Sequence, residues 1–306
     1  MNAARSSKTD LTSLTSIGID LGGTTIKGGA VNEGRIVARE ETTTPQSEDA
    51  CIEAIASIAR NLASKSTNQR IGLGVPGVIN PDGDSVAGTP NLSFLAGKPL
   101  ASRVSEILGA PVLMGNDASL AALGEAKHGA GNSHPDFLLV TLGTGVGGGL
   151  ILGNKLHTGP GMAGEIGHLQ VGHERICACG AQGCLEAVLG AAPIIENLKE
   201  CGVTSSSLPE ASQLARSGNA DAVKAFANAG KYLGEALAQV SLLLDIRVFL
   251  FAGGVSAAID LLAPSALAIL EKRAFGRKAQ DFLIARSTLG EDAGIFGAAE
   301  LALQNT

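Results

Sequence analysis

Hydrophobic and polar positions near the start of the chain form short alternating runs that are broken by glycine. The runs at 16–21, 24–31 and 35–39 are rich in β-branched residues, and glycine-containing breaks at 22–23 and 32–34 have the composition of tight turns. This pattern predicts three consecutive strands joined by two turns.

The following part of the chain predicts helices that alternate with strands. Alanine and isoleucine recur with helical spacing over 47–64, and strands are expected at 70–75 and 111–115, with helices at 101–108 and 118–128. Gly129 is placed to end the last of these helices. The alternation indicates an α/β fold.

A second glycine-rich stretch restarts the pattern. A strand over 136–142 runs into 143–149, expected to be a glycine turn before a strand at 150–152. Ile19–Gly22 and Val140–Gly143 align at an offset of 121, which also places Gly28 on Gly149 and Ala30-Val31 on Ile151-Leu152. We interpret this as an internal duplication of an α/β half that opens with a glycine-turned hairpin.

The rest of the chain is expected to be mostly helical from Ala187 onward. This helical part is interrupted by a break at 203–209 and by a buried strand at 247–252 that enters Gly253-Gly254. A final helix at 293–303 ends the chain. The expected organisation is a flexible tail at 1–16, a small lobe at 17–118 with about 290–306, and a large lobe at 119–289.

Composition narrows the class of protein. The chain has 306 residues, 45% hydrophobic and 17% charged, and its 41 glycines are about twice the usual ~7% share, which favours many turns and close backbone approaches. The net charge of −6 argues against nucleic-acid binding. No apolar run reaches about 20 residues and the tail lacks an apolar signal core, so we expect a cytoplasmic protein with no membrane partner.

The two glycine turns are candidates for binding phosphate, because backbone N–H groups converge on an anion only where side chains do not block it. A Walker A motif is absent, and the strands after both turns exclude a dinucleotide fingerprint. The alternative is a pair of ordinary hairpin turns. The expected nucleotide contacts are Gly22, Gly23, Thr24, Thr25, Gly143, Thr144 and Gly145.

Two aspartates next to predicted strand ends are candidates for chemistry. Asp20 precedes the first turn, where a carboxylate could hold water on the Mg²⁺ that accompanies ATP; the alternative is a cap on its own turn. Asp117 follows a strand and opens a helix, where an N-cap is the simpler interpretation. A carboxylate there still suits phosphoryl transfer, whose loose transition state needs the hydroxyl oriented and its proton accepted late.

A histidine and cysteine cluster predicts a metal site. His168, Cys177, Cys179 and Cys184 supply a Cys₃His set, which is typical of closed structural zinc sites. The alternatives are a disulfide, disfavoured in a reducing compartment, and His173 as the histidine ligand in place of His168. A metal-held loop would fix Glu165 and Glu186 as hydrogen-bond acceptors for sugar hydroxyls; the alternative is two solvated glutamates.

These motifs together resemble the ROK family (repressor, open reading frame, kinase), and within it the bacterial glucokinases. The resemblance covers Ile17 to Leu303. It rests on 20–24, 74–77, 90–92, 116–118, 142–149, 164–168 and the cysteine signature at 177–186.

The resemblance implies an actin-like, ribonuclease-H-like fold with ATP in a cleft between the lobes. It implies an ATP-dependent kinase for the 6-hydroxyl of a hexose, with glucose favoured, using Mg²⁺ and structural Zn²⁺ and assembling as a homodimer or homotetramer. Asp117 would be the base, and His168 would face both zinc and sugar. The other implied sugar contacts are Gly77, Asn91, Asn116, Glu165 and Glu186, and Gly253 and Gly254 would lie by the adenosine.

Alternatives and departures remain open at this point. The chain holds Thr25 two positions before the family's usual lysine-bearing turn, with Lys27 further on, so no lysine is assigned to phosphate. A sugar-sensing repressor of the same family would need a DNA-binding module before the first strand, and about sixteen residues precede it. A filament protein would not need the zinc cluster. Mannose, N-acetylmannosamine, fructose and allose are alternative substrates.

Overall fold

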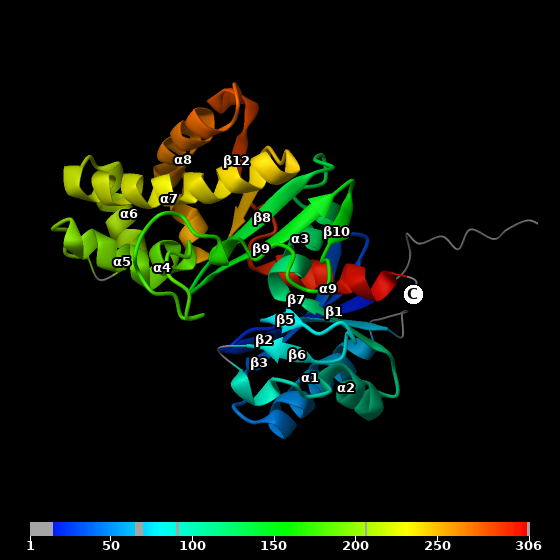
Figure 1. Ribbon diagram of the computed structural model, residues 1–306. Coiled ribbons are helices and arrows are strands. Elements are labelled where there is room, and N and C mark those ends of the chain that lie inside the picture. Colours follow the sequence, from blue (N-terminus) through cyan, green and yellow to red (C-terminus); the bar gives the residue numbers. More distant parts are fainter. Residues whose placement is uncertain (1–14, 65–69, 90–91, 206, 305–306) are drawn as a thin grey trace, which may run out of the picture. The chain divides into compact units, whose positions relative to one another are not determined.

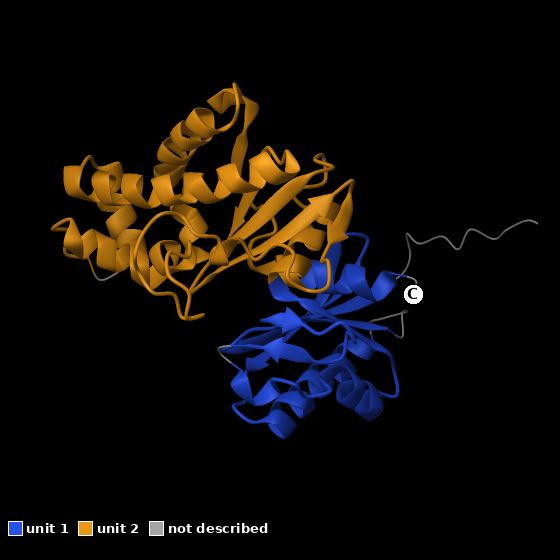
Figure 2. Ribbon diagram, viewed as in Figure 1, with its two compact units in different colours: residues 1–117, 295–306 blue, residues 118–294 orange. Residues whose placement is uncertain are grey.

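The computed structural model describes residues 15–64, 70–89, 92–205 and 207–304. The chain divides into two compact units (Figure 2), unit 1 over residues 1–117 and 295–306 and unit 2 over 118–294. Each unit contains one five-stranded sheet with helices, so the mixed α/β class expected from the sequence is confirmed.

The sheet of unit 1 begins with the three strands that the sequence predicts. Its order is β3-β2-β1-β4-β7; the first three strands are antiparallel, and β4 and β7 run parallel to β1. The bounds are β1 (Ser16–Leu21), β2 (Thr25–Asn32), β3 (Arg35–Thr43), β4 (Ile71–Val75) and β7 (Val112–Asn116). The short hairpin of β5 (Val78–Ile79) and β6 (Val86–Gly88) has too few residues for an alternating pattern and was not predicted.

Helices cover both faces of this sheet (Figure 1). On one face, α1 (Glu48–Ala63) and α2 (Leu100–Leu108) share a core with the odd-numbered residues Ile17, Ile19 and Leu21 of β1. On the other face, α9 (Ala293–Leu303) approaches the glycines of β1 and β4. Alternation along β1 therefore sends its apolar side chains to one layer and leaves glycine toward the other.

Because α9 packs closely on β4, a single methyl group added at this contact is expected to lower the free energy of unfolding. A Cβ atom on Gly72 would lie 1.7 Å from the carbonyl oxygen of Ala298, and neither backbone can move easily. Gly72→Ala is therefore expected to lower the free energy of unfolding by about 2 kcal/mol or more, as overpacking does. Gly88→Ala, where no atom lies within 4 Å of the added Cβ, is the control and should leave the urea midpoint unchanged. Equal midpoints for both variants would contradict the tight packing.

The sheet of unit 2 repeats the arrangement of unit 1. Its order is β10-β9-β8-β11-β12. Strand β9 is antiparallel to both of its neighbours, β10 and β8, whereas β11 and β12 run parallel to β8. The bounds are β8 (Phe137–Leu142), β9 (Val146–Leu152), β10 (Lys155–His157), β11 (Val248–Ala252) and β12 (Leu283–Arg286). The same order and directions in both sheets confirm the internal duplication.

The strand register corrects one detail of that duplication. Leu21 lies opposite Ile26 in the first hairpin, whereas Leu142 lies opposite Val146 in the second. The second turn is one residue shorter, so the second strands match at an offset of 120, and the expected pairing of Gly28 with Gly149 is wrong by one position. The offset of 121 holds for the first strands.

The glycines at 147–149 belong to β9 and not to the turn, which also differs from the sequence prediction. Added Cβ atoms at Gly147 and Gly149 would meet the α3 residues Ala118 and Ala122 at 3.1 and 2.5 Å. Glycine in a strand often marks such a close approach. These glycines allow α3 (Asp117–His128) to pack directly on the sheet.

The opposite face of this sheet carries the helical layer that the sequence predicts after Ala187. Leu138, Val140 and Phe249 point into a core shared with these helices, whereas Leu139 and Leu250 point toward α3. The helices are α4 (Glu186–Leu189), α5 (Ala191–Glu200), α6 (Leu208–Arg216), α7 (Ala220–Leu244) and α8 (Ile259–Arg273). Burial on both faces explains why the central strands are apolar throughout.

One helical stretch of the described chain, Gly254–Arg273, is long and apolar enough by composition to cross a membrane, contrary to the sequence expectation. It contains α8, which packs closely on α7. Cβ atoms on Gly230 and Gly234 of α7 would lie 2.4 and 2.7 Å from the carbonyl oxygens of Leu262 and Ala266. A helix in such internal packing meets the same length and composition criteria, so the stretch is weak evidence for a membrane span.

Candidate active site

The first candidate turn connects β1 to β2. The Gly22 N–H donates to the Thr25 carbonyl at 3.0 Å, and the Thr44 hydroxyl donates to the Gly22 carbonyl at 2.7 Å. Thr24 is exposed in this turn. Thr44 was missed by sequence reasoning, because it follows a strand far along the chain and carries no motif.

Asp20 lies at the carboxyl end of β1, beside this turn. It pairs in register with Lys27 on β2 and with Gly74 on β4, and Gly74 pairs in turn with Gly115 on β7. Two of these neighbours have no side chain. The carboxyl ends of parallel strands are the usual place for a ligand in α/β sheets.

The pKa of Asp20 is raised from 3.8 to about 7: burial is the largest cause, the neighbouring charge of Asp117 also raises it, and Lys27 lowers it. Burial of a carboxylate costs free energy, and carboxylates with strongly shifted pKa values are typical of functional sites. Asp117 and Asp20 therefore interact electrostatically within unit 1, which the sequence alone did not show.

The raised pKa of Asp20 predicts how stability depends on pH. A carboxyl whose folded pKa exceeds its unfolded value stabilises the fold at low pH, and that contribution is lost as pH rises from about 4 to about 7. Without nucleotide or magnesium, Asp20→Asn should be more stable than the wild type at pH 8 by a few kcal/mol, at roughly 1.4 kcal/mol per pKa unit, and equal to it near pH 4. Urea unfolding across this range tests it, with the exposed Asp221→Asn as control; parallel profiles for wild type and Asp20→Asn would contradict it.

Three of the residues assigned to the sugar meet at the end of β7. The Asn116 side-chain amide donates to the Asp117 carboxylate and to the Gly77 carbonyl, both at 3.1 Å. Gly77 has a positive φ of 107°, and a Cβ there would lie 2.1 Å from the Gly88 carbonyl oxygen. Only glycine fits this position, so its carbonyl is held toward Asn116. Asn91 lies outside the described residues.

The second candidate turn, Gly143–Gly145, is closed by a hydrogen bond from Gly143 N–H to the Gly145 carbonyl at 3.0 Å. The Glu186 carboxylate accepts from the Val146 N–H at 2.8 Å, and a Cβ on Gly145 would lie 2.4 Å from that carboxylate. Thr144 is exposed in the turn. Glu186, predicted only as a sugar contact, therefore also holds the glycine turn.

Gly253 lies beside the same turn. Its φ is +83°, and a Cβ there would lie 2.4 Å from the carbonyl oxygen of Leu142, the last residue of β8. Gly254 begins the 3₁₀ turn η4 (Gly254–Ala258), and the Ser256 hydroxyl donates to the Gly253 carbonyl at 2.7 Å. The structure thus brings Gly253 to the end of β8, where the Gly143 turn starts.

Glu165 interacts electrostatically with both His168 and Glu186 in unit 2. Burial raises the pKa of Glu165, His168 lowers it and Glu186 raises it. Glu165 precedes the 3₁₀ turn η3 (Ile166–His168), which is fixed on β9 because Gly164 and Gly148 pack backbone against backbone. Two carboxylates and an imidazole in one place can accept and donate several hydrogen bonds to hydroxyl groups.

The Cys₃His residues come together as the sequence predicts. The ligand atoms of His168, Cys177, Cys179 and Cys184 all lie within 4.8 Å of one another. Cys177 Sγ is 3.9 Å from His168 Nδ1, and Cys179 Sγ is 3.8 Å from Cys184 Sγ. A tetrahedron with Zn–S bonds of about 2.3 Å has S–S edges of about 3.8 Å, so the set fits zinc. All three cysteines are free thiols, which excludes the disulfide alternative.

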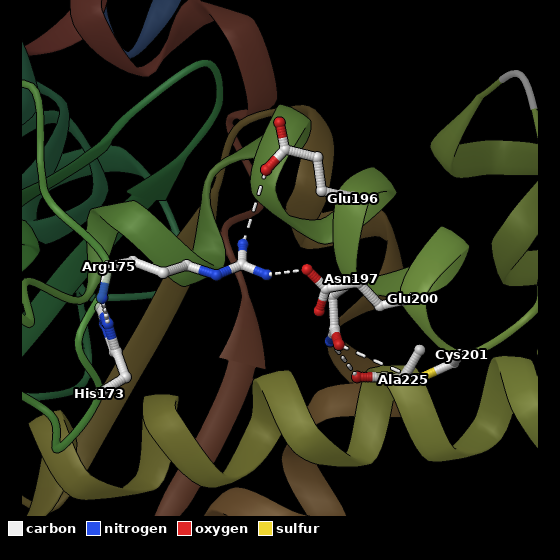
Figure 3. A network of polar contacts seen from close by, with 7 residues as sticks. All are labelled: His173, Arg175, Glu196, Asn197, Glu200, Cys201 and Ala225. Atoms are coloured by element: carbon white, nitrogen blue, oxygen red, sulfur yellow. Dashed lines mark hydrogen bonds and ion pairs between the residues drawn. The ribbon is translucent and has the colours of Figure 1, made fainter.

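His173 is occupied elsewhere. Its Nδ1 accepts from the Arg175 N–H at 3.1 Å (Figure 3). Its Nε2 lies 3.0 Å from the Cys184 carbonyl, to which it donates. The ring edge also packs on Tyr232, with centroids 5.3 Å apart. Because both nitrogens are engaged, His168 is the histidine available to the cysteine cluster.

The ROK family matches residues 16–305, and this chain belongs to it. Glucokinases of Halalkalibacterium halodurans and Streptomyces coelicolor are 37% and 33% identical over 322 and 312 residues, covering 94% of this chain and 94% and 96% of theirs. An N-acetyl-D-glucosamine kinase of Mannheimia succiniciproducens is 31% identical, covering 94% of this chain and 98% of its own.

Solved structures agree with this assignment. The ROK hexokinase of Thermus thermophilus has a TM-score of 0.83 and 30% identity, covering 94% of this chain and 97% of its own. A ROK family glucokinase of Streptomyces griseus in complex with glucose and AMPPNP has a TM-score of 0.80 and 32% identity, covering 95% and 100%. The expected actin-like ATPase fold is confirmed; the cleft between the lobes remains a prediction.

Proposed function

We propose that this protein is an ATP-dependent sugar kinase that phosphorylates the 6-hydroxyl of a hexose, with glucose as the favoured substrate. The observation that carries the proposal is the placement of Asp20, Asn116 and Asp117 together at the carboxyl ends of the parallel strands of unit 1. Membership of a family with glucokinase relatives supports the same class of reaction.

In this proposal Asp117 accepts the proton of the 6-hydroxyl as its oxygen bonds to the γ-phosphorus of ATP and the bond to the ADP oxygen breaks. Asn116 orients the carboxylate through the 3.1 Å hydrogen bond. The loose transition state of phosphoryl transfer makes positioning more important than base strength.

The nucleotide is proposed to contact the glycine turns at 22–24 and 143–145, with Gly253 and Gly254 beside the adenosine. Backbone N–H groups at such turns suit phosphate oxygens. Mg²⁺ bound with ATP would neutralise phosphate charge, and Asp20 would hold one of its waters.

The sugar is proposed to contact Glu165, His168, Glu186, Asn116 and the Gly77 backbone. Bound at the Cys₃His set, zinc would keep the loop that carries these acceptors in one conformation. Its role there is structural, because four protein ligands leave no open coordination position.

The experiment is a panel of hexoses with ATP and Mg²⁺, in which ADP release and the phosphate position of the product are followed. We expect 6-phosphorylation with the highest kcat/KM for glucose. If kcat/KM is highest for N-acetylglucosamine, N-acetylmannosamine, mannose, fructose or allose, that sugar replaces glucose as the proposed substrate and the kinase proposal stands. Absence of turnover with every hexose would overturn the kinase proposal.

A further inference from the structure

A cavity of about 470 Å³ lies in unit 2, and none of the residues discussed so far as substrate contacts lines it. Its walls come from the loop that carries the cysteine cluster and from helices α4, α5 and α7. His173 and Arg175 line it from the loop, Asn197 and Glu200 from α5, and Tyr232 from α7. Binding cavities for small ligands are commonly about 300–1,000 Å³.

The polar walls of this cavity are held in place by one another (Figure 3). The Arg175 guanidinium lies 2.7 Å from the Glu200 carboxylate and 3.6 Å from that of Glu196. The Asn197 side-chain amide donates to the Ala225 carbonyl at 3.0 Å, which ties α5 to α7. A ligand that enters such a site loses less free energy to ordering of the protein.

The charges at the cavity cancel. Arg175, Lys231 and Glu200 line it, and Glu196, which lies outside the lining, pairs with Arg175 at 3.6 Å. Together these four side chains carry two positive and two negative charges. An anion would be repelled by the carboxylates as much as it is attracted by the cations, so the balance disfavours phosphorylated or carboxylated ligands.

The remaining lining favours hydroxyl groups. Asn228 and Asn197 offer amide groups, Glu200 offers an acceptor and Tyr232 offers a phenol on an aromatic ring. A hydroxyl both donates and accepts, so a polyhydroxylated molecule can satisfy mixed donors and acceptors at once. Tyrosine adds apolar area that suits the C–H faces of a sugar ring.

We propose that this cavity is a second binding site, distinct from the substrate site, for a neutral sugar. The cavity is lined in part by the loop that carries the cysteine cluster. His173 bonds to the carbonyl of Cys184, a candidate metal ligand, and Glu186, two residues further on, holds Val146 after the glycine turn. A ligand here would therefore stabilise the loop. Any effect of this ligand on catalysis rests on the proposed kinase function, whereas binding of the ligand does not.

The chain provides its own reporter for this site. It contains no tryptophan and one tyrosine, Tyr232, so tyrosine emission of the whole protein comes from the wall of the cavity. Zinc-loaded protein without nucleotide is titrated with glucose, maltose and glucose 6-phosphate. We expect a saturable change in emission with glucose or maltose and a weaker response to glucose 6-phosphate.

Variants decide whether the signal arises in the cavity. Asn228→Ala and Glu200→Ala should each raise the sugar midpoint roughly tenfold, the effect of losing about one hydrogen bond to a ligand. Lys224→Ala, an exposed position of α7 that does not line the cavity, is the matched control and should match the wild type. Unchanged melting temperatures show that the variants fold.

Three results would overturn the proposal: no saturable response to either neutral sugar, a response to glucose 6-phosphate alone, or a sugar response that both cavity variants leave unaltered. The last result would show that Tyr232 reports binding at the substrate site. Failure of the kinase proposal is separate, because it would appear as absent turnover in the hexose panel while the fluorescence response and its loss in Asn228→Ala persist.

Discussion

Asp117→Asn is expected to lower kcat by roughly two to four orders of magnitude, the usual contribution of a positioned general base. The amide keeps the size of the side chain but cannot take the proton of the sugar hydroxyl. Hexose binding without nucleotide should stay within about threefold of the wild type, because a hydrogen-bonding group remains at the position. Turnover is measured as ADP release, and hexose binding by calorimetry.

Stability measurements separate this effect from misfolding. Asp117 raises the pKa of Asp20, so replacing it by a neutral residue lowers that pKa and relieves repulsion between two carboxylates. Asp117→Asn should therefore be at least as stable as the wild type at neutral pH. Asp221→Asn, in the first turn of α7, is the control for changing an aspartate at a helix start. Activity of Asp117→Asn within about threefold of the wild type would remove its role as base.

Cys184→Ser is expected to remove zinc and to lower both the melting temperature and the affinity for hexose. Cys184 is fully buried, and within the preceding segment 172–182 Cys177 is the only buried residue. Structural zinc in small domains contributes roughly 10–16 kcal/mol of apparent binding free energy, more than any single contact in this loop. Without it, His168 and Glu186 lose their common support, and the KM for hexose should rise about tenfold or more.

Metal analysis of purified, unchelated protein tests this directly, with about one zinc per chain expected for the wild type. Cys201→Ser is the matched control, since Cys201 is half-buried in unit 2 but lies outside the cluster. Burial, together with the neighbouring thiols of Cys177 and Cys179, raises the pKa of Cys184 in the metal-free loop. Zinc must therefore displace thiol protons, and acid should release it. Wild-type protein without zinc, or a Cys184→Ser variant that retains it, would contradict the site.

Much of the fold follows from local pattern. The hairpin strands of unit 1, the helix after Asp117 and the central strand before Gly253 have alternating or continuous apolar runs bounded by glycine, and all are present. The short strands β10 and β12 were not predicted. Each has three or four residues, too few for alternation to stand out, and each exists because a longer neighbour pairs with it.

The candidate site could likewise be predicted from the sequence only in part. The Cys₃His set was predictable because metal ligands lie close in sequence and have a recognisable spacing. The contact of Glu186 with Val146 was not, because the two residues are forty positions apart and neither belongs to a shared motif. The engagement of both His173 nitrogens likewise depends on where the folded loop places the Cys184 carbonyl.

The sequence by itself determined the class of fold, the two glycine hairpins, the candidate metal-ligand set and the family, because these depend on local periodicity and on motifs of fixed spacing. Only the tertiary structure decided the register of the second hairpin, the assignment of glycines 147–149 to a strand under α3, the proximity of Asp20 to Asp117, and the choice between His168 and His173. These depend on contacts between distant segments, whose geometry is set by the packing of whole layers and not by neighbouring residues.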